Sequence, residues 1–92
     1  MLRGEKMYNM TTVVTCPSGL HNKQATYFIQ KANDFQSSIW IEADEQKINA
    51  KSLLGVLSMA IVPGTELTIS AEGTDEELAV KSLAEMLKED LF

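Results

Sequence analysis

Hydrophobic and polar residues alternate along parts of this chain with the period of a half-buried strand. Residues 66–72 place Leu67, Ile69 and Ala71 between polar neighbours, so one side of the segment can face a core. Three further short segments are rich in Thr, Val or Ile and end at turn residues. The pattern therefore predicts four strands, at residues 7–16, 39–41, 46–50 and 66–72.

Apolar side chains recur at the spacing of one helix face in residues 22–33 and again in the final segment of the chain. Thr74 and Glu77 have the spacing of a capping box, which predicts that Thr74 caps the final helix. A short middle helix is expected to start near Ser52 and to end before Pro63. The order strand, helix, strand, strand, helix, strand, helix predicts an α+β sandwich with the helices on one face of the sheet.

The middle helix has more apolar surface than a helix on a sheet needs. With its residues placed at 100° intervals, the apolar arc is about 220° wide, whereas covering one face of a sheet takes only about 100°. Some of Leu53, Leu54 and Leu57 are therefore left over. They could form an exposed apolar patch that binds a partner, or the final helix or a loop could cover them. The pattern alone leaves both outcomes open.

Length and composition exclude several classes of protein. A chain of 92 residues with 45% hydrophobic residues fits one domain with a real core. The net charge of -5 argues against nucleic-acid binding, which needs a basic surface. No apolar stretch is long enough to cross a bilayer, and no signal-peptide pattern opens the chain. The single Cys16 allows no internal disulfide and no multi-cysteine metal site, so a reducing, cytoplasmic setting is expected.

The only histidine of the chain, His21, comes just before the first predicted helix and two residues after Gly19. The first backbone N–H groups of a helix have no intrahelical acceptor and carry a partial positive charge. An imidazole at this place could hold a phosphoryl group against those donors. A surface histidine beside a glycine turn would have the same sequence. No Gly-rich nucleotide loop and no paired-histidine motif is present, so no cofactor or metal is expected.

Two motifs, at their separation in this chain, resemble the HPr family. They are Gly19-Leu20-His21, followed by Ala25, and residues 51–58 with the sequence KSLLGVLS. HPr is the histidine-containing phosphocarrier of the bacterial sugar phosphotransferase system. The resemblance covers nearly the whole chain apart from residues 1–6. It implies a single HPr-like domain with the order βαββαβα, in which three helices cover one face of a four-stranded antiparallel sheet.

The resemblance also implies two phosphorylation positions and a docking patch. His21 would accept a phosphoryl group from Enzyme I and pass it to sugar-specific acceptor proteins. Ser52 would be modified by HPr serine kinase, and the modified protein would bind a transcription factor or an enzyme. Leu53, Leu54 and Leu57 would form the docking patch. Such a protein is a monomeric carrier or regulator rather than a turnover enzyme.

The residues that follow His21 depart from the family pattern. The family usually has His, a small residue, Arg, Pro and Ala, whereas residues 21–25 here are HNKQA. Lys23 would still stabilise a phosphoryl group by its charge, but it lacks the planar, two-pronged donor of arginine. Gln24 replaces a proline suited to the first helical turn. Three functions stay open: a carrier through His21, a regulator through Ser52, or an interaction domain that keeps only the patch. The presence of His21 favours the first.

Overall fold

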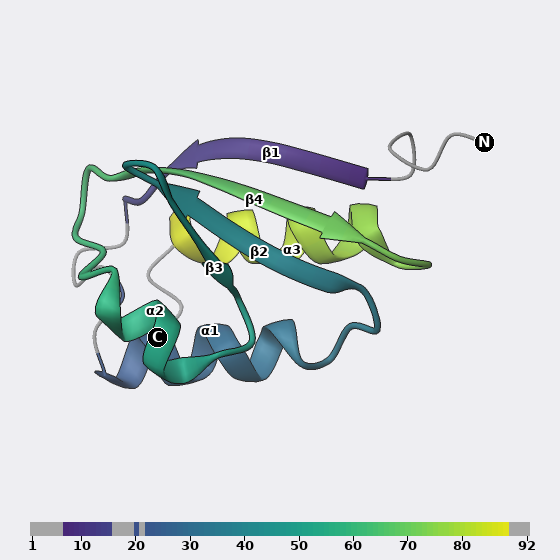
Figure 1. Cartoon of the computed structure of the whole chain (residues 1–92), viewed down its shortest axis with the longest axis horizontal. Coiled ribbons are helices and arrows are strands. Elements are labelled where there is room, and N and C mark those ends of the chain that lie inside the picture. Colours follow the sequence, from purple (N-terminus) through teal and green to yellow (C-terminus); the bar gives the residue numbers. More distant parts are fainter. Residues whose placement is uncertain (1–6, 16–19, 21, 89–92) are drawn as a thin grey trace.

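The computed structural model describes residues 7–15, 20 and 22–88 of the chain, so His21 and Cys16 lie outside the described residues. Seven elements follow one another in the predicted order (Figure 1). They are β1 (Met7–Val13), α1 (Asn22–Ala32), β2 (Ser38–Ala43), β3 (Gln46–Asn49), α2 (Leu53–Ser58), β4 (Glu66–Glu72) and α3 (Glu76–Lys88).

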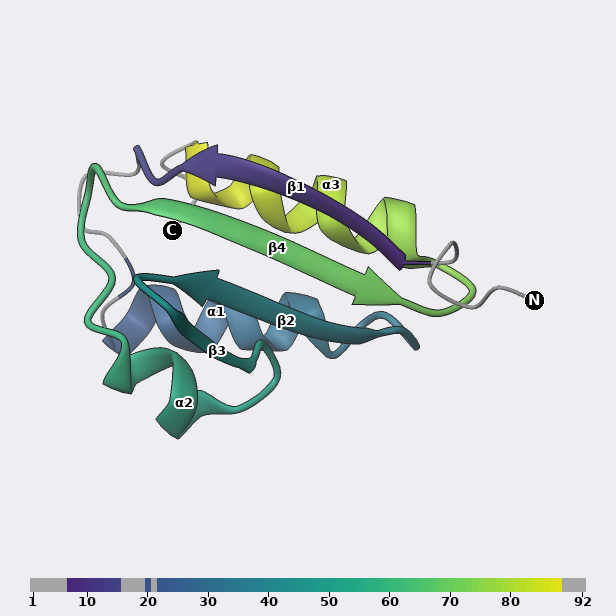
Figure 2. The same cartoon turned by 45° about the horizontal axis from the view of Figure 1, so that its top comes forward.

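The four strands form one antiparallel sheet in the order β1-β4-β2-β3. The last strand in sequence, β4, lies between β1 and β2, where Ile69 pairs with Met10 on one side and with Ile41 on the other. Helices α1 and α3 lie on the same face of the sheet, and α2 packs against α1 and β3 (Figures 1 and 2). This is the predicted α+β sandwich.

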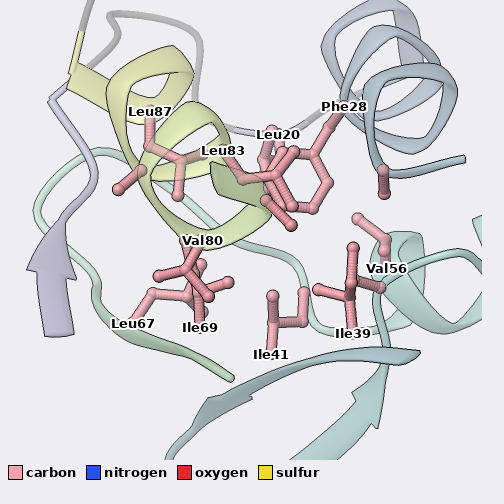
Figure 3. Close-up of a cluster of buried hydrophobic side chains, with 14 of the residues drawn as sticks. Leu20, Phe28, Ile39, Ile41, Val56, Leu67, Ile69, Val80, Leu83 and Leu87 are labelled. Carbon is pink, nitrogen blue, oxygen red and sulfur yellow. The ribbon is translucent and has the colours of Figure 1, made fainter. Parts of the chain in front are cut away.

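The core lies between the sheet and the helices. Alternation along β2 and β4 sends every second side chain toward the helices, while α1 and α3 present the apolar faces that their periodicity predicts. α2 contributes one fully buried side chain, Val56. Ten of the largest buried side chains are labelled in Figure 3: Leu20, Phe28, Ile39, Ile41, Val56, Leu67, Ile69, Val80, Leu83 and Leu87.

The middle helix is shorter than predicted. It ends at Ser58, with Met59 as its C-cap, whereas the sequence pattern continues to Pro63. The chain turns away because Ala60 adopts a left-handed backbone conformation with φ of 50°. Alanine is a strong helix former and rarely takes this conformation. The residue types around Ala60 therefore do not predict that the helix ends at Ser58.

The predicted capping box of α3 is wrong by one residue. The first helical hydrogen bond runs from the Ala79 N–H to the Asp75 carbonyl, and α3 begins at Glu76. The side chain that reaches back is Glu76, which accepts a hydrogen bond from the Gly73 N–H at 3.1 Å. Glu77 instead pairs with Lys81, one turn further along the helix, at 2.8 Å. Asp75, and not Thr74, therefore stands before the helix.

Candidate functional site

Leu20, the residue before His21, is fixed to the loop between α2 and β4. The Leu20 side chain is buried in the core, and its N–H donates to the Ile61 carbonyl at 3.0 Å. On the C-terminal side, α1 begins at Asn22. His21 thus follows an anchored residue and directly precedes a helix in the sequence, which is the position that the sequence argument assigns to it.

The first turn of α1 carries a positive charge and no acidic side chain. Lys23 is exposed in this turn, and its ammonium lies 6.0 Å from the centre of the Tyr27 ring, one helical turn later. A cation over an aromatic face at this distance is weakly attracted to it. Because the first N–H groups of any helix have no acceptor within the helix, they add to the ammonium in making this turn favourable for an anion.

Ser52 is the N-cap of α2. Its backbone is extended, with φ of -102° and ψ of 113°, and its side-chain oxygen accepts a hydrogen bond from the Gly55 N–H at 3.2 Å. Its own carbonyl accepts the first helical bond, from the Val56 N–H at 2.9 Å. The hydroxyl is therefore held at the start of a helix, where added negative charge is favourable.

The three leucines of α2 do not share one environment. Leu54 is 81% exposed and Leu53 is 41% exposed, whereas Leu57 is partly buried and packs against the core. The excess apolar surface predicted for this helix is therefore real at Leu53 and Leu54, and largely covered at Leu57. We call Leu53 and Leu54 the α2 patch.

Two further side chains hold the loop between α1 and β2, and the sequence analysis missed both. The Lys51 ammonium donates to the Phe35 carbonyl at 2.9 Å. The Asp75 carboxylate accepts hydrogen bonds from the N–H groups of Gln36 and Ser37, at 2.9 and 3.0 Å, and from the Ser37 hydroxyl. The Ser37 hydroxyl and then the Gln36 N–H hold the pKa of the Asp75 carboxyl below its usual range.

The described part of the chain offers no group of three or more His, Cys, Asp or Glu side chains that could hold a metal ion. Within the same residues, no helix is both long and apolar enough to cross a membrane.

Comparison with known proteins gives a consistent relationship over almost the whole chain. The family model described as "PTS HPr component phosphorylation site" matches residues 8–89. The HPr-like protein Crh of Bacillus subtilis is 39% identical over 85 residues, which span 92% of this chain and 100% of that protein.

Solved structures agree in fold. The crystal structure of the phosphocarrier protein HPr from Bacillus anthracis has a TM-score of 0.86 and 40% identity, over 88% of this chain and 96% of that one. A crystal structure of Bacillus subtilis Crh has a TM-score of 0.73 and 41% identity, over 83% of this chain and 87% of that one. That Crh structure is described as a dimer with a swapping domain. A monomer therefore stays a prediction for this chain.

Proposed function

Because this chain belongs to the HPr family, we propose that it carries a phosphoryl group on His21 within a bacterial phosphoenolpyruvate-dependent sugar phosphotransferase system. The observation that supports this most directly is the match to a family model for a phosphorylation site, which runs through His21. Enzyme I would supply the phosphoryl group and sugar-specific acceptor proteins would take it. The expected compartment is the cytoplasm, and the protein acts as a carrier rather than a turnover enzyme.

In this proposal the imidazole of His21 is the nucleophile. A bond forms between a ring nitrogen and phosphorus while the bond between phosphorus and the donor breaks. In a second exchange, a nucleophile of the acceptor protein forms a bond to phosphorus while the bond between the ring nitrogen and phosphorus breaks. The start of α1 supplies backbone N–H groups that have no acceptor within the helix, together with the Lys23 ammonium. Gln24 lacks the fixed backbone geometry that a proline gives to the first helical turn. Lys23 supplies charge without the two-pronged contact of arginine.

The experiment follows phosphoryl transfer from phosphoenolpyruvate through Enzyme I by rapid quench. His21→Ala is expected to abolish uptake. The double variant Lys23→Arg with Gln24→Pro is expected to speed transfer, because a two-pronged, charged hydrogen bond is worth roughly 1.5–3 kcal/mol. An unchanged rate in the double variant would show that these two positions do not limit the chemistry.

A second function, regulation through Ser52, is favoured by the cap geometry of α2. A phosphate on Ser52 carries about -1.5 to -2 charge, which a helix N-terminus accommodates. The domain would stay folded while negative charge appears next to the α2 patch. That change would weaken docking of an acidic surface such as one on Enzyme I, and would favour a transcription factor or enzyme that presents arginines.

Treatment with HPr serine kinase and ATP, followed by peptide mapping, tests this second function. Ser58 is the matched control, because it lies at the other end of α2 and its hydroxyl donates to the Gly55 carbonyl at 2.7 Å. We expect phosphate on Ser52 and none on Ser58. Labelling of Ser58, or no labelling at all, would contradict regulation through Ser52.

A further inference from the structure

The segment that carries Ser52 joins a turn to the short helix α2. Helix α2 has six residues, and a helix this short is not stable on its own. Val56 is its one buried side chain. Before the helix, the Ser52 N–H donates to the Asn49 carbonyl at 3.1 Å and the Lys51 N–H to the Asn49 side chain at 2.8 Å. These two bonds shape the turn itself, while the N–H of the buried Ala50 donates to the Ile39 carbonyl at 2.9 Å and ties the start of the turn to β2.

Lys51 connects the same turn to a second element, on the side that leads into α2. Its ammonium crosses from the turn before α2 to the Phe35 carbonyl, in the loop between α1 and β2. A hydrogen bond from a charged donor is stronger than one between neutral groups. Phe35 is itself buried, and the Lys31 ammonium lies 5.8 Å from its ring centre. The acceptor of Lys51 thus belongs to a well-packed residue.

The loop that accepts the Lys51 hydrogen bond is also held by Asp75, the residue before α3. Asp75 accepts the N–H groups of Gln36 and Ser37, the two residues that follow Phe35. Ser37 is almost completely buried at this point. A continuous series of polar contacts therefore runs from the Ser52 cap through Lys51 and the loop to the start of α3.

We propose that Lys51 is a positioning residue for Ser52: its ammonium, anchored on the Phe35 carbonyl, holds the turn that presents the Ser52 hydroxyl for modification. This inference rests on the proposed regulation through Ser52. Without the anchor, the turn and the first residues of α2 open more often, and the hydrogen bond from the Gly55 N–H to the Ser52 oxygen is lost in the open form. A smaller fraction of molecules then presents the serine in the conformation that a kinase binds.

The first arm of the test measures amide hydrogen exchange at Gly55 in the full chain. Lys51→Met keeps the aliphatic stem and removes the donor, so exchange at Gly55 is expected to be about tenfold faster. Lys51→Arg keeps a charged donor and is expected to restore slow exchange. Ile69→Val is the control for a general loss of stability, because it removes a core methyl group far from α2 and should leave local opening at Gly55 unchanged.

A double variant tests whether the loop transmits the effect. Asp75→Asn weakens the hydrogen bonds that the carboxylate accepts from Gln36 and Ser37, and it leaves Lys51 unchanged. It should also speed exchange at Gly55. That increase should vanish in the Lys51→Met background, because the loop no longer connects to the turn. Additive effects of the two substitutions would contradict transmission through the loop.

The second arm measures steady-state phosphorylation of Ser52 by HPr serine kinase. Lys51→Met is expected to raise KM with kcat little changed, by a smaller factor than the rise in Gly55 exchange because KM scales with the inverse of the fraction of molecules in the closed conformation. Lys51→Arg is expected to recover the wild-type KM. Slow Gly55 exchange in Lys51→Met would overturn the proposal, even if its KM rises, because Lys51 would then act by touching the kinase. If wild-type Ser52 is not phosphorylated, regulation through Ser52 fails, while the exchange arm still decides the role of Lys51 in the fold.

Discussion

The substitution of Leu54 by Glu tests the account of the α2 patch, and Leu57→Glu is its matched control. Both changes put the same charged side chain on the same short helix. Leu54 is 81% exposed, so the new carboxylate stays in water and displaces almost no packing. A surface change of this kind alters the free energy of unfolding by less than about 0.5 kcal/mol. For a domain of this size, Tm should fall by no more than about 2–4 °C.

Leu57 packs against the core, so the same change there has a different cost. Burying a leucine side chain contributes about 1.5–3 kcal/mol, part of which is lost, and a carboxylate without a partner adds a desolvation cost. A loss of about 2 kcal/mol or more is expected, which lowers Tm by about 8–16 °C.

Thermal and urea unfolding, followed by circular dichroism, measure both variants. Binding to Enzyme I should weaken in Leu54→Glu although its fold is intact. If Leu54→Glu destabilises the protein as much as Leu57→Glu, Leu54 belongs to the core and the α2 patch does not exist as described.

Two further predictions concern the contacts between the loop before β2 and α3. The Ser37 hydroxyl and the Gln36 N–H lower the pKa of Asp75 from 3.8, so this contact stabilises the fold above about pH 4 and is lost as pH falls through the lowered pKa. Asp75→Asn should therefore reduce the fall in Tm between pH 7 and pH 3, and an unchanged fall would refute the role of this carboxylate. Gly73→Ala should destabilise by about 3 kcal/mol, because its Cβ would lie 2.6 Å from the Ser37 Cα, a backbone atom that cannot move aside as a flexible side chain could. Gly64→Ala is the comparison: a Cβ there meets no atom within 4 Å, so only its positive φ of 94° adds a cost of about 1 kcal/mol. Equal unfolding free energies for the two alanine variants would contradict the close approach at Gly73.

Periodicity predicted the elements whose burial is regular. The limits of β4 are those that the alternation around Leu67 and Ile69 predicts. The start of α2 at Leu53 follows the cap at Ser52. The excess of leucine on this helix left open whether the surplus is exposed or covered, and the structure shows both outcomes: Leu53 and Leu54 are exposed, and Leu57 packs against the core.

Features that depend on distant parts of the chain were not predictable from local patterns. The Lys51 ammonium meets a carbonyl 16 residues earlier, and Asp75 meets N–H groups 38 and 39 residues earlier. Only the packing of the helices on the sheet brings these groups together. The early end of α2 at Ser58 likewise follows from the left-handed conformation of Ala60, against the intrinsic preference of alanine.

Phosphorylation of His21 is the central claim, and intact-protein mass spectrometry tests it most directly. The full chain is incubated with phosphoenolpyruvate and Enzyme I, next to an HPr that is known to accept the group. We predict one added phosphoryl group per chain, labile in acid, present in Ser52→Ala and absent from His21→Ala. No added mass, under conditions that label the reference HPr, would contradict the carrier function.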